Sequence, residues 1–266
     1  MMKLAVLVLA AIWVHLARCR RLTDDLDNEI LGSTTNLGMA TGRTRDWVRI
    51  SQSPSPRISR PVGSHIELEC EAMGSPAPVM QWLKGNTPLT ENESFETNAI
   101  NDNPSQGMAK TKSRLVINSA IPMHEGTFTC LAESGSQIAS AQTKLHLVRN
   151  GSPERNFTHL LAEEILAGRS PARIVLFNTI YLDNIGSDIV LPCKAVGNPI
   201  PDIIWLDPSE RVISSANDGR LSILADGELR IRSIRWDDMG VYTCVARNAV
   251  AQDSISTFVY PMLAEK

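Results

Sequence analysis

The feature that most constrains the fold of this chain is an internal sequence repeat. Two blocks repeat, the first at an offset of 123 residues and the second at 114: Gly63–Pro78 and Trp82 align with Gly186–Pro201 and Trp205, then Leu115–Ile117 and Gly126–Cys130 align with Leu229–Ile231 and Gly240–Cys244. The difference between the offsets is an insertion of 9 residues in the first copy. The chain of 266 residues is therefore a tandem repeat of two related domains.

Apolar and polar residues alternate within each copy. Ile66, Leu68 and Cys70 alternate with Glu67 and Glu69, and the second copy repeats the pattern from residue 189. Such alternation is typical of strands that bury one face and expose the other. Two further alternating triplets, 221–223 and 229–231, flank an Asp-Gly pair, which predicts a hairpin. The sequence thus predicts an all-β chain.

The first residues have the pattern of a secretory leader. Lys3 precedes a nearly uncharged apolar run from Leu4 to Leu16, which is too short for a bilayer of roughly 30 Å. We expect residues 1–19 to be a signal peptide cleaved after Cys19. No second apolar run of 18 residues follows, so we expect a secreted, extracellular protein without membrane insertion.

Cleavage there would leave an even number of cysteines. The four are Cys70, Cys130, Cys193 and Cys244. In an oxidising compartment an even set indicates two disulfides. The chain has no C-x-x-C motif and no close Cys/His cluster, so we expect no metal site and no cofactor.

The pattern Cys…Trp…Asp-x-Gly-x-Tyr-x-Cys resembles that of immunoglobulin domains of the intermediate set. The resemblance implies two β-sandwiches, each with one disulfide across its core: Cys70–Cys130 and Cys193–Cys244. It implies that Trp82 and Trp205 pack on these disulfides. It also places Tyr242 at the tyrosine corner, with Asp238 paired to a basic residue, for which Arg220 is the candidate.

The first copy departs from this pattern at two positions. His124 stands where the motif has Asp, and Phe128 stands where it has Tyr. A phenyl ring fills the space but lacks the hydroxyl of the corner. We expect the first domain to be less stable than the second.

The segments outside the two copies complete the domain plan. We expect a flexible tail at residues 20–45, an immunoglobulin-like domain at 46–149, a linker at 150–171 and a second domain at 172–266. Residues 91–112 of the first domain are expected to be a long polar insertion. Three Asn-x-Ser/Thr sequences predict glycosylation of secreted loops, at Asn92, Asn150 and Asn156.

The linker contains a helical pattern. Phe157, Leu161 and Ile165 recur every four residues, with Leu160 beside them, which predicts a short amphipathic helix. Its apolar face either packs on one of the sandwiches, the interpretation we favour, or lines a partner-binding surface. A helix wedged between the domains would satisfy both.

Composition and motifs argue against enzymes and nucleic-acid binders. The net charge is −3, and no basic stripe of the kind that binds nucleic acid is present. No histidine has a serine or cysteine nucleophile motif near it in the sequence, and the sequence has no phosphate-binding loop motif. We therefore expect recognition rather than catalysis.

Family-specific segments go further than the fold. Trp236–Asn248, Asp253–Leu263 and Cys70–Ser75 resemble the insect secreted insulin-binding family, also called neural/ectodermal development factor or insulin-related peptide binding protein. The resemblance implies capture of insulin-like peptide hormones and reduced growth signalling.

Two alternatives stay open. Nematode secreted two-immunoglobulin proteins are similar, which would make the chain a neuronal or adhesion factor that binds a cell-surface receptor. Immunoglobulin edge strands can also join sheets across molecules, so a homodimer is possible.

Overall fold

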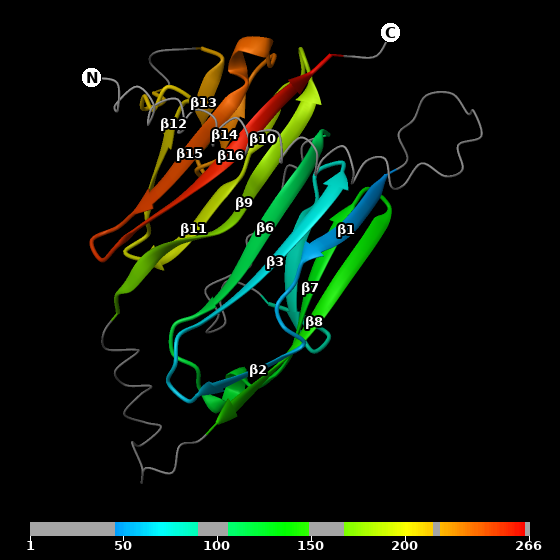
Figure 1. Ribbon diagram of the computed structural model, residues 1–266. Coiled ribbons are helices and arrows are strands. Elements are labelled where there is room, and N and C mark those ends of the chain that lie inside the picture. Colours follow the sequence, from blue (N-terminus) through cyan, green and yellow to red (C-terminus); the bar gives the residue numbers. More distant parts are fainter. Residues whose placement is uncertain (1–45, 90–105, 149–167, 215–218, 264–266) are drawn as a thin grey trace, which may run out of the picture. The chain divides into compact units, whose positions relative to one another are not determined.

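The computed structural model describes residues 46–89, 106–148, 168–214 and 219–263. Within them the chain is all-β apart from two 3₁₀ turns (Figure 1). The elements in chain order are β1 (Trp47–Gln52), β2 (Arg57–Pro61), β3 (Ile66–Ser75), β4 (Val79–Lys84), β5 (Thr87–Pro88), β6 (Met108–Ile117), η1 (Pro122–His124), β7 (Gly126–Ser134), β8 (Gln137–Val148), β9 (Ser170–Asn184), β10 (Ile189–Leu191), β11 (Cys193–Asn198), β12 (Asp202–Leu206), β13 (Leu221–Ile223), β14 (Leu229–Ile231), η2 (Trp236–Asp238), β15 (Gly240–Arg247) and β16 (Gln252–Met262).

The first domain is a sandwich of β1-β3-β6 against the five-stranded sheet β2-β8-β7-β4-β5. Cys70 of β3 is bonded to Cys130 of β7, with 6.4 Å between their Cα atoms, so the disulfide joins the two sheets. Trp82 is fully buried in this core, and its Nε1 donates to Ser113 Oγ at 3.0 Å. The alternating residues of β3 supply the buried face, as the pattern predicted.

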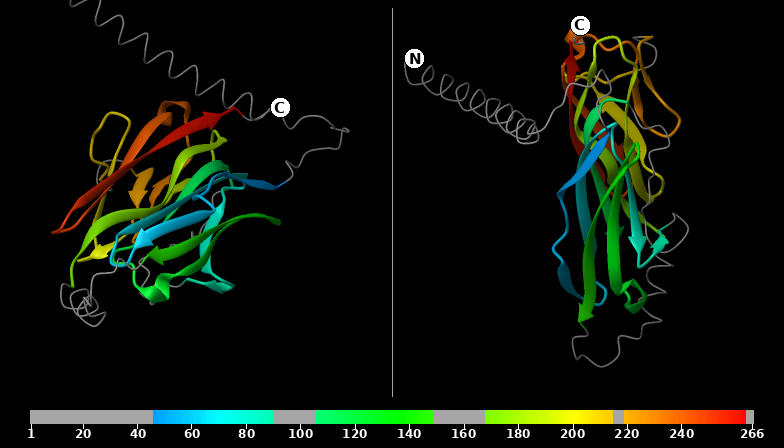
Figure 2. Two further views of the ribbon diagram at one scale, coloured as in Figure 1. Left: turned by 60° about the horizontal axis from the view of Figure 1, so that its bottom comes forward. Right: turned by 90° about the vertical axis from the view of Figure 1, so that its right-hand side faces the viewer.

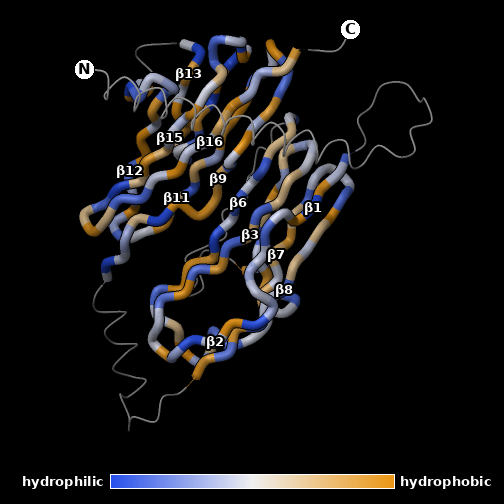
Figure 3. The backbone as a smooth tube through the Cα atoms, viewed as in Figure 1, coloured by the Kyte–Doolittle hydropathy of each residue, from blue (hydrophilic) through white to orange (hydrophobic). Residues whose placement is uncertain are grey.

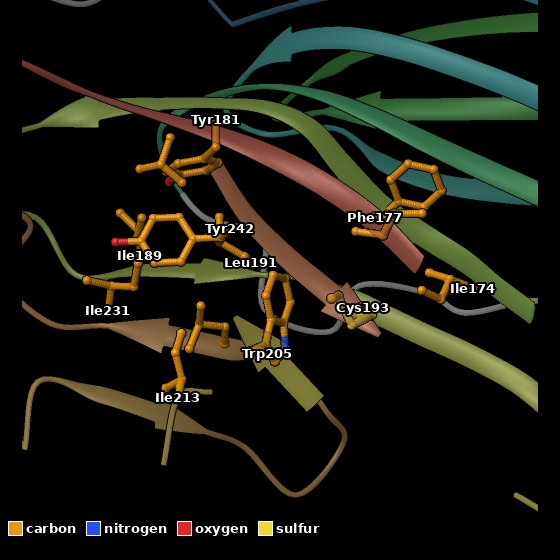
Figure 4. Close-up of a cluster of buried hydrophobic side chains, with 14 of the residues drawn as sticks. Ile174, Phe177, Tyr181, Ile189, Leu191, Cys193, Trp205, Ile213, Ile231 and Tyr242 are labelled. Carbon is orange, nitrogen blue, oxygen red and sulfur yellow. A yellow bond between two sulfur atoms is a disulfide. The ribbon is translucent and has the colours of Figure 1, made fainter. Parts of the chain in front are cut away.

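The second domain repeats this arrangement. Its small sheet β10-β14-β13 contains the expected hairpin, and β16-β15-β12 lies opposite. Cys193 is bonded to Cys244, and Trp205 Nε1 donates to Gly227 O at 2.9 Å. Figure 4 shows the indole beside Cys193 in this core, with Tyr181 and Tyr242 further along it.

Tyr242 and Asp238 form the corner of the second domain. The Tyr242 hydroxyl donates to Asp238 O at 3.1 Å. The Arg220 guanidinium donates to both carboxylate oxygens of Asp238, at 2.8 and 3.0 Å. Burial would raise the pKa of Asp238, but hydrogen bonds from Arg220 and from the Arg235 N–H outweigh it and hold that pKa below its ordinary value.

His124 takes the place of this aspartate in the first domain. Its Nδ1 accepts a hydrogen bond from Ile121 N at 3.0 Å, as Asp238 Oδ2 accepts one from Arg235 N at 2.7 Å. At the repeat offset of 114, Gln106 is the equivalent of Arg220. The first domain therefore lacks both residues of the Arg220–Asp238 ion pair. His124 is 1% exposed, and burial together with the positive charge of Lys84 lowers its pKa to about 4. The neutral imidazole is thus the folded form.

The two sandwiches share one sheet. Its strand order is β1-β3-β6-β9-β16-β15-β12, with β11 also paired to β9. The junction is the antiparallel pair β6–β9, which has six residue pairs between Met108–Ser113 and Leu176–Leu182. Both turned views of Figure 2 show these strands running side by side. In an ordinary immunoglobulin sheet ABED, strand D would pair with E, here β6. The first strand of the second domain occupies that edge instead.

Side chains close the junction between the domains. Thr111 Oγ1 donates to Asn178 Oδ1 at 2.9 Å. The fully buried Tyr181 accepts a hydrogen bond from Gly107 N at 3.3 Å, and its hydroxyl donates to Asp183 Oδ2 at 2.9 Å. The hydrophobic clusters also cross the boundary: Leu176 belongs to the first core, whereas Ala77 and Ala109 belong to the second.

Arg114 of β6 links four strands. Its Nε donates to Glu69 on β3 at 2.9 Å, and its Nη1 donates to Ile174 O on β9 at 3.2 Å and to Asp253 on β16 at 3.3 Å. The guanidinium lies 5.0 Å from the Phe177 ring centroid. A planar group with five donors suits such a position, where lysine would satisfy fewer partners.

Two expectations about boundaries are wrong. Residues 108–112 were assigned to the polar insertion but form the first half of β6. Residues 170–171 were assigned to the linker but begin β9. Both segments look polar or irregular in sequence. Residues 108–112 pair with β9 across the junction, which alternation within one domain does not reveal. Ser170 pairs instead with Asn198 of β11, within the second domain.

We predict that the first domain loses stability in mild acid. The unfolded imidazole takes up a proton below its ordinary pKa of 6.5, whereas the folded one stays neutral until pH is about 4. Stability is therefore present above pH 6.5 and falls as the pH drops toward 4, by about 2 kcal/mol between pH 7 and pH 5. Denaturant unfolding at the two pH values measures this. His124→Asn, which removes the titration, should flatten the dependence. A His124 that titrates near 6.5 by NMR would contradict the prediction.

We also predict that Gly107→Ala separates the domains. A Cβ there would lie 2.4 Å from Leu182 O and 2.6 Å from the Tyr181 hydroxyl, so β6 and β9 must move apart. We expect a cost of about 1–3 kcal/mol, with unfolding split into two transitions. Gly219→Ala is the matched control, because a Cβ at Gly219 meets nothing within 4 Å. If the Gly107→Ala variant unfolds in one transition, as the wild-type protein does, the junction does not have the role given to it.

Candidate functional site

The residues singled out from the sequence divide into two groups. The cysteines, Trp82, Trp205 and Tyr242 all lie in the two cores, where they hold the sandwiches together. The others lie outside the described residues: Phe157, Leu160, Leu161 and Ile165 of the linker, and Asn92, Asn150 and Asn156. The search for a functional surface is therefore made among the described residues.

Chemistry-bearing clusters do not guide this search. In the part of the chain that the structure describes, no group of three or more His, Cys, Asp or Glu side chains is placed to hold a metal ion. No helix in that same part has the length and apolar character needed to cross a membrane. The remaining feature is an apolar area on the surface of the shared sheet.

Six side chains form this area, which we call the apolar strip. It lies on the outer face of the shared sheet and consists of two rows that cross its strands: Val241, Phe258 and Ile180 in one, Tyr260, Leu182 and Met108 in the other. The register pairs Phe258 with Ile180 and Tyr260 with Leu182, so the rows continue across the junction into β6. The strip therefore draws on both domains.

The strip is most exposed on β15 and β16; on β9 and β6 its side chains are partly buried, and Leu182 is only 8% exposed. Val241, Phe258 and Tyr260 are 46%, 36% and 37% exposed. Trp236 of η2 is 49% exposed and extends the strip, with its ring 6.0 Å from that of Tyr260 in an edge-to-face arrangement. Contiguous exposed aromatic and aliphatic side chains of this kind mark interaction sites more often than scattered ones do.

The strip is elongated across the strands. The next outward row toward the other end of β15 and β16 is polar, and Thr243 and Ser256 hydrogen-bond there at 3.2 Å. On β16 the outward residues change from Ser254 and Ser256 to Phe258 and Tyr260. This change from serine to aromatic residues is the sequence signal that could have revealed the strip. Side chains at outward positions do not pack in the core, so aromatic residues there indicate an exposed apolar surface.

A ladder of charges borders the strip on β3 and β6. Lys110 pairs with Glu71 at 3.3 Å, and Lys112 pairs with Glu69 at 3.5 Å. Lys110 lies opposite Ile180, so it is the first charged side chain next to the strip. Figure 3 shows hydrophobic residues on β9 and hydrophilic residues in the middle of β6. The surface is thus an apolar band with a cation at the end on the first domain.

The comparisons with known proteins agree with the architecture. The model of the immunoglobulin domain family matches residues 49–134 and 173–248. Zwei Ig domain protein zig-4 of Caenorhabditis elegans is 29% identical over 209 residues, which cover 76% of this chain and 75% of that protein.

Higher similarity is found to an insect protein. Neural/ectodermal development factor IMP-L2 of Drosophila melanogaster is 33% identical over 221 residues, covering 83% of this chain and 79% of that protein. The crystal structure of neural ectodermal development factor IMP-L2 matches with a TM-score of 0.66 and 32% identity, over 83% of this chain and 97% of that one. The chain therefore belongs to the IMP-L2 family of two-immunoglobulin-domain proteins.

Proposed function

We propose that this chain is a secreted binding protein that captures insulin-like peptides in extracellular fluid and so lowers insulin and growth signalling. A captured peptide does not reach its receptor. The observation that carries the proposal is the apolar strip, which offers exposed aromatic side chains on a sheet made by both domains. Family membership supports it, and the immunoglobulin fold points to binding rather than to catalysis.

The strip suits the capture of a folded peptide. Binding energy in protein interfaces concentrates in a few aromatic and large apolar residues, and Trp236, Phe258 and Tyr260 are of that kind. The β6–β9 pairing and the Arg114 contacts hold the two parts of the strip in one sheet before the partner arrives. A preformed surface loses less conformational entropy on binding than one that must assemble.

Further parts of this proposal concern the segments outside the described residues. They are a leader at residues 1–19 cleaved after Cys19, a tail at 20–45 and sugars on Asn92, Asn150 and Asn156. Mass spectrometry of the secreted protein tests each of them. The proposal also includes immunoglobulin units at residues 46–149 and 172–266 with the linker at 150–171 between them, although strand β9 already begins at Ser170.

A secreted neuronal or adhesion factor is the second candidate. It is favoured by the similarity to the nematode zwei Ig domain protein, which spans both domains at almost the same length. Such a factor would bind a cell-surface receptor and show no affinity for insulin-like peptides. The two candidates therefore separate on one binding measurement.

We predict saturable binding of a labelled insulin-like peptide to the purified secreted protein. Titration calorimetry or fluorescence anisotropy measures it, and the same peptide after reduction and alkylation serves as the control, because it has lost its fold. We expect a dissociation constant well below about 1 μM for the native peptide only. Absence of saturation up to about 10 μM would exclude hormone capture and favour the adhesion factor.

The linker prediction needs a separate test. Replacing Leu161 and Ile165 by Ser should weaken peptide binding if the linker helix lines the binding surface. It should instead lower only the unfolding temperature if the helix packs on a sandwich. Unchanged values for both quantities would remove the linker helix from either role.

A further inference from the structure

We propose that two copies of this chain pair face to face through the outer face of the sheet β2-β8-β7-β4-β5. This sheet is the one that the first domain does not share with the second, so its outer face and the apolar strip lie on opposite sides of the chain. The dimer differs from a pairing of edge strands and does not depend on the capture of a peptide. It follows from the composition of the face and from the charges at its two ends.

The middle of this face carries no charge. Two rows of outward side chains cross β4, β7 and β8 there, and they consist of Gln81, Leu131 and Ser140 and of Leu83, Thr129 and Gln142. The outer face of β3 and β6 in the same protein carries paired charges instead, such as Glu69 with Lys112, as a sheet face in water commonly does. Depletion of charged residues is typical of the centre of a protein interface.

Charges of opposite sign lie at the two ends of the face. Glu133 lies in the row on one side of the neutral rows, next to Ile138, which is 65% exposed. Lys144 lies in the row on the other side, next to Arg57 of β2. Among the described residues, Glu133, Lys144 and Arg57 form no ion pair.

These charges cannot neutralise one another within one chain. The row of Glu133 and the row of Lys144 are six residues apart along β8, which is about 20 Å. Two cations opposite each other on neighbouring strands repel, so Lys144 and Arg57 favour a carboxylate from another molecule.

The face is complementary to itself when a second copy is turned about a two-fold axis that runs across the strands. The neutral rows then cover each other, and the row of Glu133 lies on the row of Lys144 of the second copy. Neighbouring strands are about 4.8 Å apart, so Glu133 on β7 is within reach of Lys144 on β8 of the second copy. Symmetry forms this contact twice. An axis along the strands would instead bring Glu133 onto Glu133, so the charges select one orientation.

The dimer has a consequence for binding. Because the interface uses the other sheet of each first domain, the apolar strip stays uncovered in both copies. A dimer therefore presents two strips that face away from each other.

Sedimentation velocity of the secreted full-length protein tests the association. We expect a reversible dimer with a dissociation constant on the order of 10 μM, as suits an interface of one sheet face, so the average mass should rise from monomer to dimer between about 0.5 and 100 μM. A protein that is still monomeric at about 100 μM would overturn the inference.

Charge reversal identifies the interface. Glu133→Lys and Lys144→Glu should each weaken self-association by at least about tenfold, because each creates two like-charged contacts. A mixture of these two variants should form a heterodimer, because both contacts then join opposite charges, and the double variant should again pair with itself. Glu210→Lys, an exposed charge of the second domain, is the matched control and should not change the dimer. Unfolding curves check that each variant is folded.

The outcome of charge reversal does not depend on hormone capture. If Glu133→Lys and Lys144→Glu dimerise as strongly as the wild-type protein, the copies meet elsewhere and the inference is wrong. If each variant is monomeric but their mixture and the double variant do not associate, the proposed orientation is wrong. Neither result bears on the affinity for an insulin-like peptide, so the proposed function stands or fails by its own titration.

Discussion

The pairing of β6 with β9 is the interaction on which the rest of this structure depends. A sandwich whose strand E has no neighbour exposes a row of backbone donors and acceptors, which is costly in stability and invites aggregation. The second domain covers that row with its own first strand. The two domains are therefore not independent but share one sheet. Through Leu176 and Ala109 each also contributes to the hydrophobic core of the other.

The shared sheet also carries the surface that we propose for binding. The second domain supplies five of the six side chains of the apolar strip, and the first domain adds Met108 at its end. Buried groups at the junction, such as Tyr181 with Gly107 and Asp183, fix the register of the rows. A shift of one residue between β6 and β9 would turn Met108 and Lys110 into the core and Ala109 outward. The same contacts that stabilise the junction thus determine what the surface presents.

The sequence predicted most of each sandwich and little of what joins them. The hairpin at 221–231 and the exchange of Asp for His124 could be read locally, because alternation and motif spacing are local properties. The disulfide pairing and the buried tryptophans followed from the resemblance to immunoglobulin domains. The start of β6 could not, since Lys110 and Lys112 look like loop residues until β9 pairs with them. The strip was missed for a similar reason: Phe258 and Tyr260 were read as family markers, although their outward register already set them apart from Ser254 and Ser256.

Hydrogen exchange of the backbone amides tests the shared sheet most directly. If the two sandwiches are one sheet, peptides covering 108–113 and 176–182 should be protected together in the intact chain, to the level of the disulfide-bonded core strands. Exchange of either peptide at the rate of an open edge would contradict the account, because β6 and β9 would then be edges of independent domains.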